Sequence, residues 1–323
     1  MSKAIRIHTH GGPEVLKWEQ LPTPQPGPTE ALIRHEAVGV NYIDIYFRTG
    51  LYKTPLPATL GIEGAGEVLA VGEAVKTISP GDRVAYAGGP LGSYATERVI
   101  NADRLLKLPD DIDYQTGAAM MLQGLTAYFL LHRTFKVQPG QTILVHAAAG
   151  GVGLIMCQWA KHLGAKVIGV VSSVAKAELI LANGAAHAVI GHANLAAEVK
   201  QITGGAMVPV VYDSVGKDTF NASLDCLAPL GLMVCYGNAS GPVPPFDIAT
   251  LVTKGSLFLT RPSFATYMAA PQDLATGAAA LFEAVRCGIV KIRVNQTFPL
   301  EQAAAAHAAL EARQTTGSTV LLP

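Results

Sequence analysis

The sequence predicts an α/β protein in which a doubly wound parallel sheet is joined to a β-rich part. Three observations predict it. Strand-like and helix-like apolar runs alternate from residue 142 onwards, a small-residue turn joins the first of these strands to its helix, and the residues before about 123 show short strands without a repeating strand–helix unit. At 323 residues the chain is longer than one hydrophobic core usually supports, so two domains are expected.

The first part of the chain is expected to form short strands, because proline- and glycine-rich stretches at 21–28 and 79–82 separate apolar alternations. These alternations lie at Lys3–His8, Glu30–Val40, Gly66–Val71 and Arg83–Ala87. The end of the chain is helical before a last strand. The elements expected there are a helix over Gln272–Cys287, a helix over Leu300–Arg313 and a strand over Ser318–Leu322.

The middle of the chain carries the strand–helix series, which follows a helix expected over Leu125–Thr134. Strands are expected at 142–147, 166–171, 187–190, 208–213 and 231–236, with a last apolar run at 255–260. The helices between them are expected at 151–163, 175–183, 194–203 and 217–228. Such alternation with short connections is typical of a parallel sheet that helices cover on both faces.

The turn after the first strand of this series has the spacing of a dinucleotide-binding loop, with one departure. Ala148 takes the first glycine position, Gly150 the second and Gly153 the third. The second glycine lets the backbone approach a pyrophosphate, the third lets the helix pack on the strand, and the helix N-terminus faces the phosphates. Glycine-rich turns also occur for structural reasons, so the turn alone does not decide between a binding site and a packing feature.

Composition limits the classes of function. Lys plus Arg and Asp plus Glu number 24 each, so no basic excess favours nucleic acid. The N-terminus lacks the apolar core of a signal peptide, and no apolar run is long enough for a membrane span, so a cytoplasmic protein with neither nucleic acid nor membrane as a partner is expected. The four cysteines have no metal-ligand spacing and are expected to be buried thiols.

The end of the second strand indicates which nucleotide binds. NAD sites usually place Asp or Glu there, about 20 residues past the glycines, to bind the ribose 2′-hydroxyl. Here the strand ends in Ser172 and Ser173, and Lys176 follows with no carboxylate before Glu178. A missing anion beside a cation fits the 2′-phosphate of NADPH, although a solvated Lys176 on a helix face is the alternative interpretation.

Motifs spread over nearly the whole chain resemble one family. They are GVNYIDIYFRTGLY (39–52), GIEGAGEV (61–68), PGDRV (80–84), LQGLTAYFLL (122–131), HAAAGGVGLIMCQWAKHLGA (146–165), VVYDSVGKDTF (210–220), YGNASG (236–241) and GSLFLTRPS (255–263). The chain is similar to the zinc-independent medium-chain dehydrogenase/reductase family, especially its bacterial, zeta-crystallin-like NADPH:quinone oxidoreductases.

This resemblance implies a discontinuous catalytic domain of the GroES-like type, 1–123 with 262–323, around a Rossmann domain at 124–261. It also implies a homodimer joined near 255–260 and a nicotinamide held in the domain cleft. Zinc-containing relatives have Cys and His where this chain has Asn41 and Ile62. Because an amide and an aliphatic chain do not hold Zn²⁺, no metal is expected.

By family position, five residues would line the acceptor site as donors or walls: Asn41, Tyr46, Tyr52, Thr126 and Arg261. Simple packing is the alternative for the two tyrosines. Glu63 and Asp44 are charged residues within apolar runs, and they are expected to be either structural hydrogen-bonding groups or proton donors. A general acid is not obligatory, because water can protonate a reduced quinone.

The resemblance also implies the contacts to NADPH. The expected residues are Gly150, Gly151, Val152, Gly153, Ser172, Ser173, Lys176, Ser214, Tyr236, Asn238 and Arg313. His192 replaces a tyrosine that the family often has beside the adenosine phosphate, and it either lines that site or faces solvent.

We therefore expect an NADPH-dependent quinone oxidoreductase that works without zinc, since hydride delivery to an electron-poor acceptor needs mainly proximity and orientation. Two alternatives stay open at this point. One is an NADPH-dependent reductase of α,β-unsaturated carbonyls such as enones, and the other is a crystallin-like NADPH-binding protein with little turnover.

Overall fold

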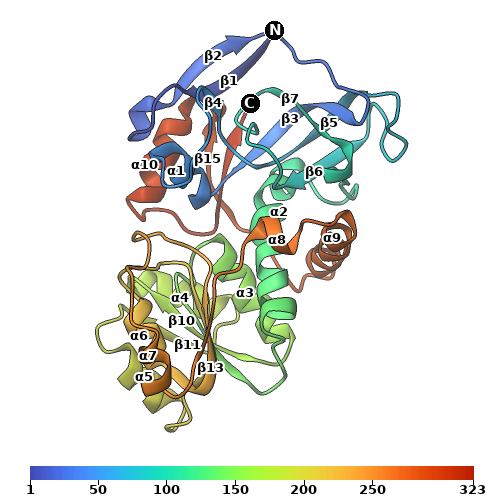
Figure 1. The fold of residues 1–323 in the computed structure, drawn as a ribbon. Helices are drawn as coiled ribbons and strands as arrows, with labels where there is room; N and C mark the ends of the chain where they lie inside the picture. The colour runs from blue at the N-terminus through green and yellow to red at the C-terminus, as the bar shows by residue number, and fades with distance from the viewer. The chain divides into compact units, whose positions relative to one another are not determined.

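The structure, a computed structural model, describes residues 1–323 and divides into two compact units (Figure 1). Unit 1 comprises Met1–Leu125, Met268–Arg286 and Ile292–Pro323. Unit 2 comprises Thr126–Tyr267 and Cys287–Lys291. The domain boundaries expected from the sequence, 1–123 with 262–323 and 124–261, remain a proposal.

Unit 2 is built on a six-stranded parallel sheet with the order β11-β10-β9-β12-β13-β14. Its strands are β9 (Thr142–Val145), β10 (Lys166–Val171), β11 (His187–Ile190), β12 (Val208–Asp213), β13 (Leu227–Cys235) and β14 (Phe258–Thr260). Its helices are α3 (Gly151–His162), α4 (Val174–Ala182), α5 (Leu195–Ile202), α6 (Phe220–Asp225), α7 (Ala249–Thr253) and α8 (Phe264–Tyr267). The strand order reverses between β9 and β12, which confirms the expected doubly wound sheet.

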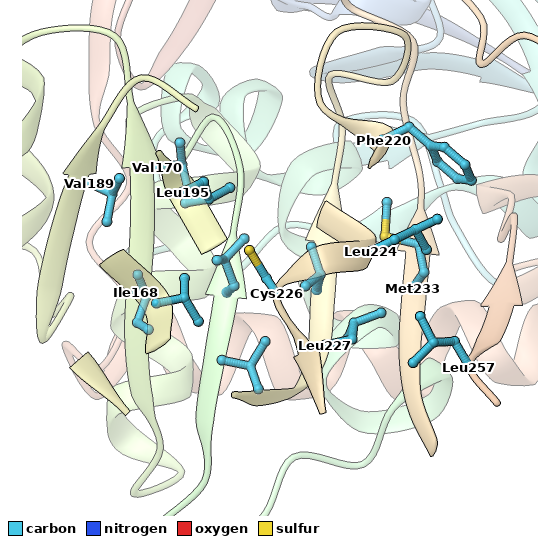
Figure 2. Packing of buried hydrophobic residues seen from close by; sticks show 14 of the residues in the cluster. Ile168, Val170, Val189, Leu195, Phe220, Leu224, Cys226, Leu227, Met233 and Leu257 are labelled. Atoms are coloured by element: carbon cyan, nitrogen blue, oxygen red, sulfur yellow. The ribbon is translucent and has the colours of Figure 1, made fainter. Parts of the chain in front are cut away.

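Helices cover both faces of this sheet, and successive side chains along a strand point to opposite faces. Ile168 and Val170 point into a core that residues of α5 and α6 complete, among them Leu195 and Leu224 (Figure 2). Between them, Gly169 faces the other side, where it lies against Ile180 of α4. The strands are therefore buried on both faces, which explains why they read as nearly continuous apolar runs.

Unit 1 contains two sheets (Figure 1). The larger has the order β15-β16-β3-β5-β6-β8, with β7 also paired to β3. Its strands are β15 (Val294–Pro299), β16 (Ser318–Leu322), β3 (Glu30–Val40), β5 (Glu63–Val71), β6 (Arg83–Ala87), β7 (Glu97–Asn101) and β8 (Leu106–Lys107). A three-stranded sheet is formed by β1 (Ser2–Ile7), β2 (Lys17–Leu21) and β4 (Ala58–Thr59). Because β16 pairs with β3, the last segment of the chain completes the sheet that the first segment began.

The helices of unit 1 differ most from expectation. They are α1 (Tyr42–Thr49), the first part of α2 (Tyr114–Phe129), α9 (Pro271–Arg286) and α10 (Ala303–Glu311), with short 3₁₀ turns at Pro13–Val15, Ala102–Arg104 and Leu300–Gln302. The sequence did not indicate α1, and it placed the helix of α2 eleven residues too late, at Leu125 rather than Tyr114. Both misses have a physical reason: α1 is short and reads as a strand-like alternation, and α2 is buried nearly all round, so it lacks a polar stripe. No helix has both the length and the apolar character needed to cross a membrane.

Candidate functional site

The turn that follows β9 has the geometry of a phosphate-binding loop. Ala147 adopts a positive φ of 48°, and Gly150 then forms the N-cap of α3. A Cβ on Gly153 would lie 2.6 Å from both the Ala147 carbonyl oxygen and the Ala148 Cα, so close packing of helix on strand requires glycine there. A Cβ on Gly150 would meet only the Ala147 oxygen, at 3.3 Å. The protein itself therefore leaves space above Gly150, as a nearby pyrophosphate requires.

The alanine in the first glycine position is accommodated by the neighbouring strand. A Cβ on Gly169 of β10 would lie 2.9 Å from the Ala148 Cβ and would also collide with Ile180 of α4. The methyl group of Ala148 is fully buried in the space that Gly169 leaves open. Alanine can therefore occupy the first glycine position because residue 169, on the neighbouring strand, is a glycine.

The strand ends beside this turn are fixed by a buried polar cluster. Asp213, at the end of β12, accepts hydrogen bonds from the hydroxyls of Thr219 (2.7 Å) and Ser223 (2.9 Å). Ser223 Oγ also lies 2.9 Å from Nε2 of His146, which follows β9. Burial lowers the pKa of His146, so it is neutral. The cluster joins the two strand ends at the point where the strand order reverses, where ligands of doubly wound sheets bind.

The residues expected at the 2′-phosphate lie at one edge of the sheet. Ser172 is exposed directly after β10, and Ser173 caps α4 by accepting a hydrogen bond from the backbone N–H of Lys176 (3.4 Å). Lys176 is half-buried in the first turn of that helix. His192 is exposed two residues after β11, which pairs in parallel with β10. The carboxyl ends of parallel strands meet at one edge, so these residues gather there without a carboxylate at the end of β10.

A second group of predicted residues gathers at the carboxyl ends of β12 and β13. Arg261 Nη1 donates to the Cys235 carbonyl oxygen (2.8 Å), and its Nη2 donates to the side-chain oxygen of Asn238 (3.1 Å) when the amide is turned toward it. Tyr236 directly follows Cys235, and desolvation raises the pKa of its hydroxyl although Ser214 hydrogen-bonds to it. The structure therefore places Arg261 beside Asn238 and beside the backbone of Cys235, which precedes Tyr236.

In unit 1, Asn41 lies at the centre of a buried polar cluster. It is the N-cap of α1, and its backbone N–H donates to Asp44 (2.9 Å). Its side-chain Nδ2 donates to Glu63 Oε2 (2.6 Å), and its Oδ1 accepts a hydrogen bond from Gln123 Nε2 (3.2 Å). The Leu122 backbone N–H donates to the other oxygen of Glu63 (2.7 Å). The amide of Asn41 is thus held with its nitrogen toward a carboxylate.

The two carboxyl groups near Asn41 are fully buried, and burial raises both of their pKa values. It raises the pKa of Glu63 to about 8, even though hydrogen bonds from Asn41 and Leu122 act in the opposite direction. It raises the pKa of Asp44 to about 7, against hydrogen bonds from the Asn41 N–H and the Tyr94 hydroxyl. Asp44 Oδ1 has no hydrogen-bond partner in the protein. Neither group is exposed to solvent, and both accept hydrogen bonds from backbone N–H groups of unit 1.

Aromatic rings surround the start of α1. Tyr46 is packed against Tyr42 (ring centroids 5.6 Å apart) and against Tyr52 (5.2 Å), and Tyr52 also contacts Phe47 (5.6 Å). The structure therefore brings together the two tyrosines expected as walls, and the ring of Tyr42 packs against Tyr46. Thr126 is half-buried on α2, in the part assigned to unit 2.

Two other predicted features can be located. Arg313 follows α10 with a positive φ of 57°, an unusual backbone conformation for a residue other than glycine. Ile62 is buried immediately before Glu63 and offers no metal-ligating atom. No group of three or more His, Cys, Asp or Glu side chains is arranged to hold a metal ion.

Sequence reasoning missed the other members of the Asn41 cluster. Gln123 and Ser318 are buried polar residues that stand in the apolar runs MMLQGL and STVLL. A polar residue in such a run signals a buried hydrogen bond, but the sequence does not say with which partner.

Comparison with known proteins places these features in context. Two family models match: an alcohol dehydrogenase GroES-like domain over residues 27–110 and a zinc-binding dehydrogenase over residues 151–282. The quinone oxidoreductase of Pseudomonas aeruginosa is 51% identical over 325 residues that cover 100% of both chains. A 2-haloacrylate reductase from a Burkholderia species is 45% identical, covering 100% of this chain and 99% of its own. The crystal structure of Escherichia coli quinone oxidoreductase complexed with NADPH has a TM-score of 0.98 at 46% identity, with 100% of each chain covered.

Proposed function

The chain belongs to the quinone oxidoreductases of the medium-chain dehydrogenase/reductase family, and we propose that it reduces quinones with NADPH, unit 2 holding the cofactor and unit 1 orienting the acceptor. The observation that carries the proposal is the full-length likeness to a quinone oxidoreductase complexed with NADPH, at 46% identity and a TM-score of 0.98. The turn at Gly150 fits such a cofactor, because only glycine fits at Gly153 and space remains above Gly150.

The residues of unit 2 would hold NADPH along the carboxyl edge of its sheet. In the proposed arrangement the N–H groups at the start of α3, from Gly151 to Gly153, face the pyrophosphate. Ser172, Ser173 and Lys176 bind the 2′-phosphate, as the absence of a carboxylate at the end of β10 favours. NADPH supplies the hydride.

Further cofactor contacts are proposed at the other strand ends and in unit 1. Ser214, Tyr236 and Asn238, which lie at the ends of β12 and β13, bind the remainder of the cofactor. Arg313 of unit 1 and His192 remain proposed phosphate-side residues.

Residues of unit 1 would orient the acceptor. Asn41 Nδ2 carries two hydrogens and has one acceptor in the protein, Glu63 Oε2. The second hydrogen is proposed to donate to the acceptor's carbonyl oxygen, which gains negative charge as it is reduced. Tyr46 and Tyr52 would form apolar walls for a planar ring. Thr126 and Arg261 stay proposed contributors to this site, and solvent water protonates the product oxygen.

Reduction of activated alkenes is a second candidate because one relative, 45% identical over the whole chain, is a 2-haloacrylate reductase. The same N–H donor and the same hydride geometry would serve an alkene conjugated to a carbonyl or carboxylate. The two candidates differ in the acceptor and not in the cofactor.

We further propose a homodimer. Large apolar side chains are exposed on the edge strand β14 and around α7, among them Phe258 (60% exposed), Ile248 (75%) and Val252 (70%). An unpaired edge strand with exposed apolar residues favours pairing with another chain.

The test is anaerobic NADPH oxidation against a panel of small quinones, enones and 2-haloacrylate, with electron paramagnetic resonance to distinguish one- from two-electron reduction. We expect quinones to be reduced with the highest kcat/KM. A higher kcat/KM for the alkenes would favour the second candidate. Tight NADPH binding with negligible oxidation across the panel would contradict both and would favour a binding protein.

A further inference from the structure

The Asn41 amide belongs to a line of side-chain hydrogen bonds that all run in one direction. Ser318 Oγ donates to Gln123 Oε1 (2.7 Å), Gln123 Nε2 donates to Asn41 Oδ1 (3.2 Å), and Asn41 Nδ2 donates to Glu63 Oε2 (2.6 Å). Four elements contribute one residue each: the start of β16, α2, the N-cap of α1 and the start of β5. All four side chains are buried.

The carboxyl group at the end of this line has neighbours on both of its oxygens. Glu63 Oε1 accepts the Leu122 N–H, and a Cβ on Gly39 would collide with Glu63 Oε2. Glycine at position 39 therefore leaves the space that the carboxylate occupies. Glu63 is therefore fixed in place opposite the Asn41 amide.

An isolated amide can rotate by 180° and exchange its oxygen and nitrogen at little cost. Here rotation would place Asn41 Nδ2 against Gln123 Nε2, so that two donors would face each other, and it would place Asn41 Oδ1 against Glu63 Oε2, which is a second acceptor in the ionised form. The Ser318 hydroxyl favours the observed orientation of Gln123, because its contact with Gln123 Oε1 (2.7 Å) is shorter than its contact with the Ala119 carbonyl oxygen (3.1 Å). In a buried, low-dielectric surrounding such aligned bonds also polarise one another and strengthen the donor character of the next N–H.

We propose that Gln123 and Ser318 are positioning residues for the reaction, which act through Asn41 by fixing its nitrogen as the donor to the acceptor's oxygen. The inference rests on the proposed function, in which that donor stabilises the developing charge. It goes beyond it by assigning a role to two residues that do not touch the acceptor. The residues could instead serve only to tie the four elements together, in which case they would affect stability and not turnover.

The experiment compares Ser318→Ala, Ser318→Thr, Gln123→Met and Asn41→Ala in the full-length protein. Asn41→Ala is expected to lower kcat for a quinone about 100-fold, as loss of one oxyanion donor does. Ser318→Ala and Gln123→Met are expected to lower kcat about tenfold, as loss of a group that orients a catalytic side chain does. Ser318→Thr keeps the hydroxyl and should recover most of kcat. The Kd for NADPH, measured by fluorescence, should change less than about twofold in all four, since the cofactor residues are untouched.

A double-mutant comparison separates positioning from structural support. If Ser318 acts through Asn41, adding Ser318→Ala to Asn41→Ala should produce no further loss of kcat. Ser2→Ala is the matched control, because Ser2 is another buried serine of unit 1 and its hydroxyl bonds Thr96 (3.1 Å) instead. That variant should keep the parent kcat.

The outcomes distinguish failure of the positioning role from failure of the donor role. The positioning role would be overturned by additive losses of kcat in the double variant, or by wild-type kcat in both Ser318→Ala and Gln123→Met. In either case a low kcat of Asn41→Ala would still support the proposed donor. Full activity of Asn41→Ala would instead overturn the donor role on which the inference rests. Should Ser318→Ala fail to fold, Gln123→Met, whose side chain has a similar volume, decides the question.

Discussion

Asn41 stands where the family resemblance implies a cysteine ligand in zinc-containing relatives. Its amide donates to Glu63 and accepts from Gln123. The neighbouring ligand position is aliphatic, since Ile62 is buried and has no polar side-chain atom. In the proposed site, residue 41 therefore stabilises negative charge on the acceptor's oxygen through a hydrogen-bond donor.

Glu63 gives a prediction about pH. Burial raises its folded-state pKa to about 8 from the usual 4.5, so between these values the folded protein holds a proton that the unfolded chain releases. Folding stability from this group is therefore present below pH 4.5 and is lost as pH rises through 8. Urea unfolding at pH 5.5 and 8.5 should show that wild type loses more free energy of unfolding than Glu63→Gln, which cannot titrate.

Asp44, Tyr86 and Tyr94 interact with Glu63 and are retained in both proteins. Burial raises the pKa of both tyrosines above the usual value, so they do not titrate between pH 5.5 and 8.5. Asp44, whose pKa burial raises to about 7, does titrate there, so the difference between the two proteins measures Glu63 together with its coupling to Asp44. Equal pH dependence of wild type and Glu63→Gln would show that Glu63 is ionised in the folded protein throughout this range.

Lys176 gives a prediction about cofactor choice. A charge-assisted hydrogen bond is worth about 1.5–3 kcal/mol, which corresponds to about 10- to 100-fold in affinity. Lys176→Ala should therefore weaken NADPH binding by about that factor and leave NADH binding nearly unchanged, as isothermal titration calorimetry with both cofactors would show. Lys200→Ala, an exposed lysine on α5, is the control. Equal losses for NADPH and NADH would rule out a specific contact to the 2′-phosphate.

At the scale of elements, the strands and helices with a strong hydrophobic periodicity were predicted most accurately from the sequence. The strands β3 and β10 were expected with the observed ends, because alternation or a continuous apolar run has sharp polar boundaries. The start of α2 was missed, since a helix buried nearly all round has no polar stripe and carries Gly117 and Gly124. Gly124 is explained only by the structure, where a Cβ would crowd Leu281 of α9.

The candidate site was predictable in part for the same reason. Residues with a local motif, such as those of the turn at Gly150 or the pair Ser172 and Ser173 at the end of a strand, could be proposed as site residues from the local sequence. Gln123 and Ser318 were not, because their hydrogen bond joins residues 195 positions apart and no local pattern records it. The cofactor and acceptor roles of all these residues stay predictions.

The contact between the turn and β10 is testable by compensation. Gly169→Ala should destabilise the protein by about 1–3 kcal/mol, as overpacking of a well-filled core does, since the added methyl meets Ala148 and Ile180. It should also weaken NADPH binding, because Ala148 belongs to the turn. Adding Ala148→Gly should restore part of both losses. Denaturation and NADPH titration of the two single variants and the double variant measure the coupling, and strictly additive losses would show that the two positions are independent.

At the scale of the whole molecule, the two halves of the proposed reaction are assigned to different units. The residues proposed for cofactor choice lie in unit 2, at the carboxyl edge of one sheet, and Asn41 with its partners lies in unit 1. Substitutions around Asn41 should therefore change acceptor turnover at constant cofactor affinity. Unit 1 itself depends on both ends of the chain, since β16 pairs with β3 and supplies Ser318.

The exposed face of unit 2 gives the last prediction. Phe258 lies on β14, whose one neighbour in the sheet is β13, so one edge of this strand is open to pairing. Replacing Phe258 with Asp adds a charge to an apolar edge, which natural sheets use to block strand pairing. Wild type should therefore sediment as a dimer, and Phe258→Asp should sediment as a monomer that retains its affinity for NADPH. Leu181→Asp, which changes an exposed leucine on α4 (47% exposed), should remain a dimer. A monomeric wild type would refute the proposed assembly, whereas a dimeric Phe258→Asp protein would place the interface on another surface.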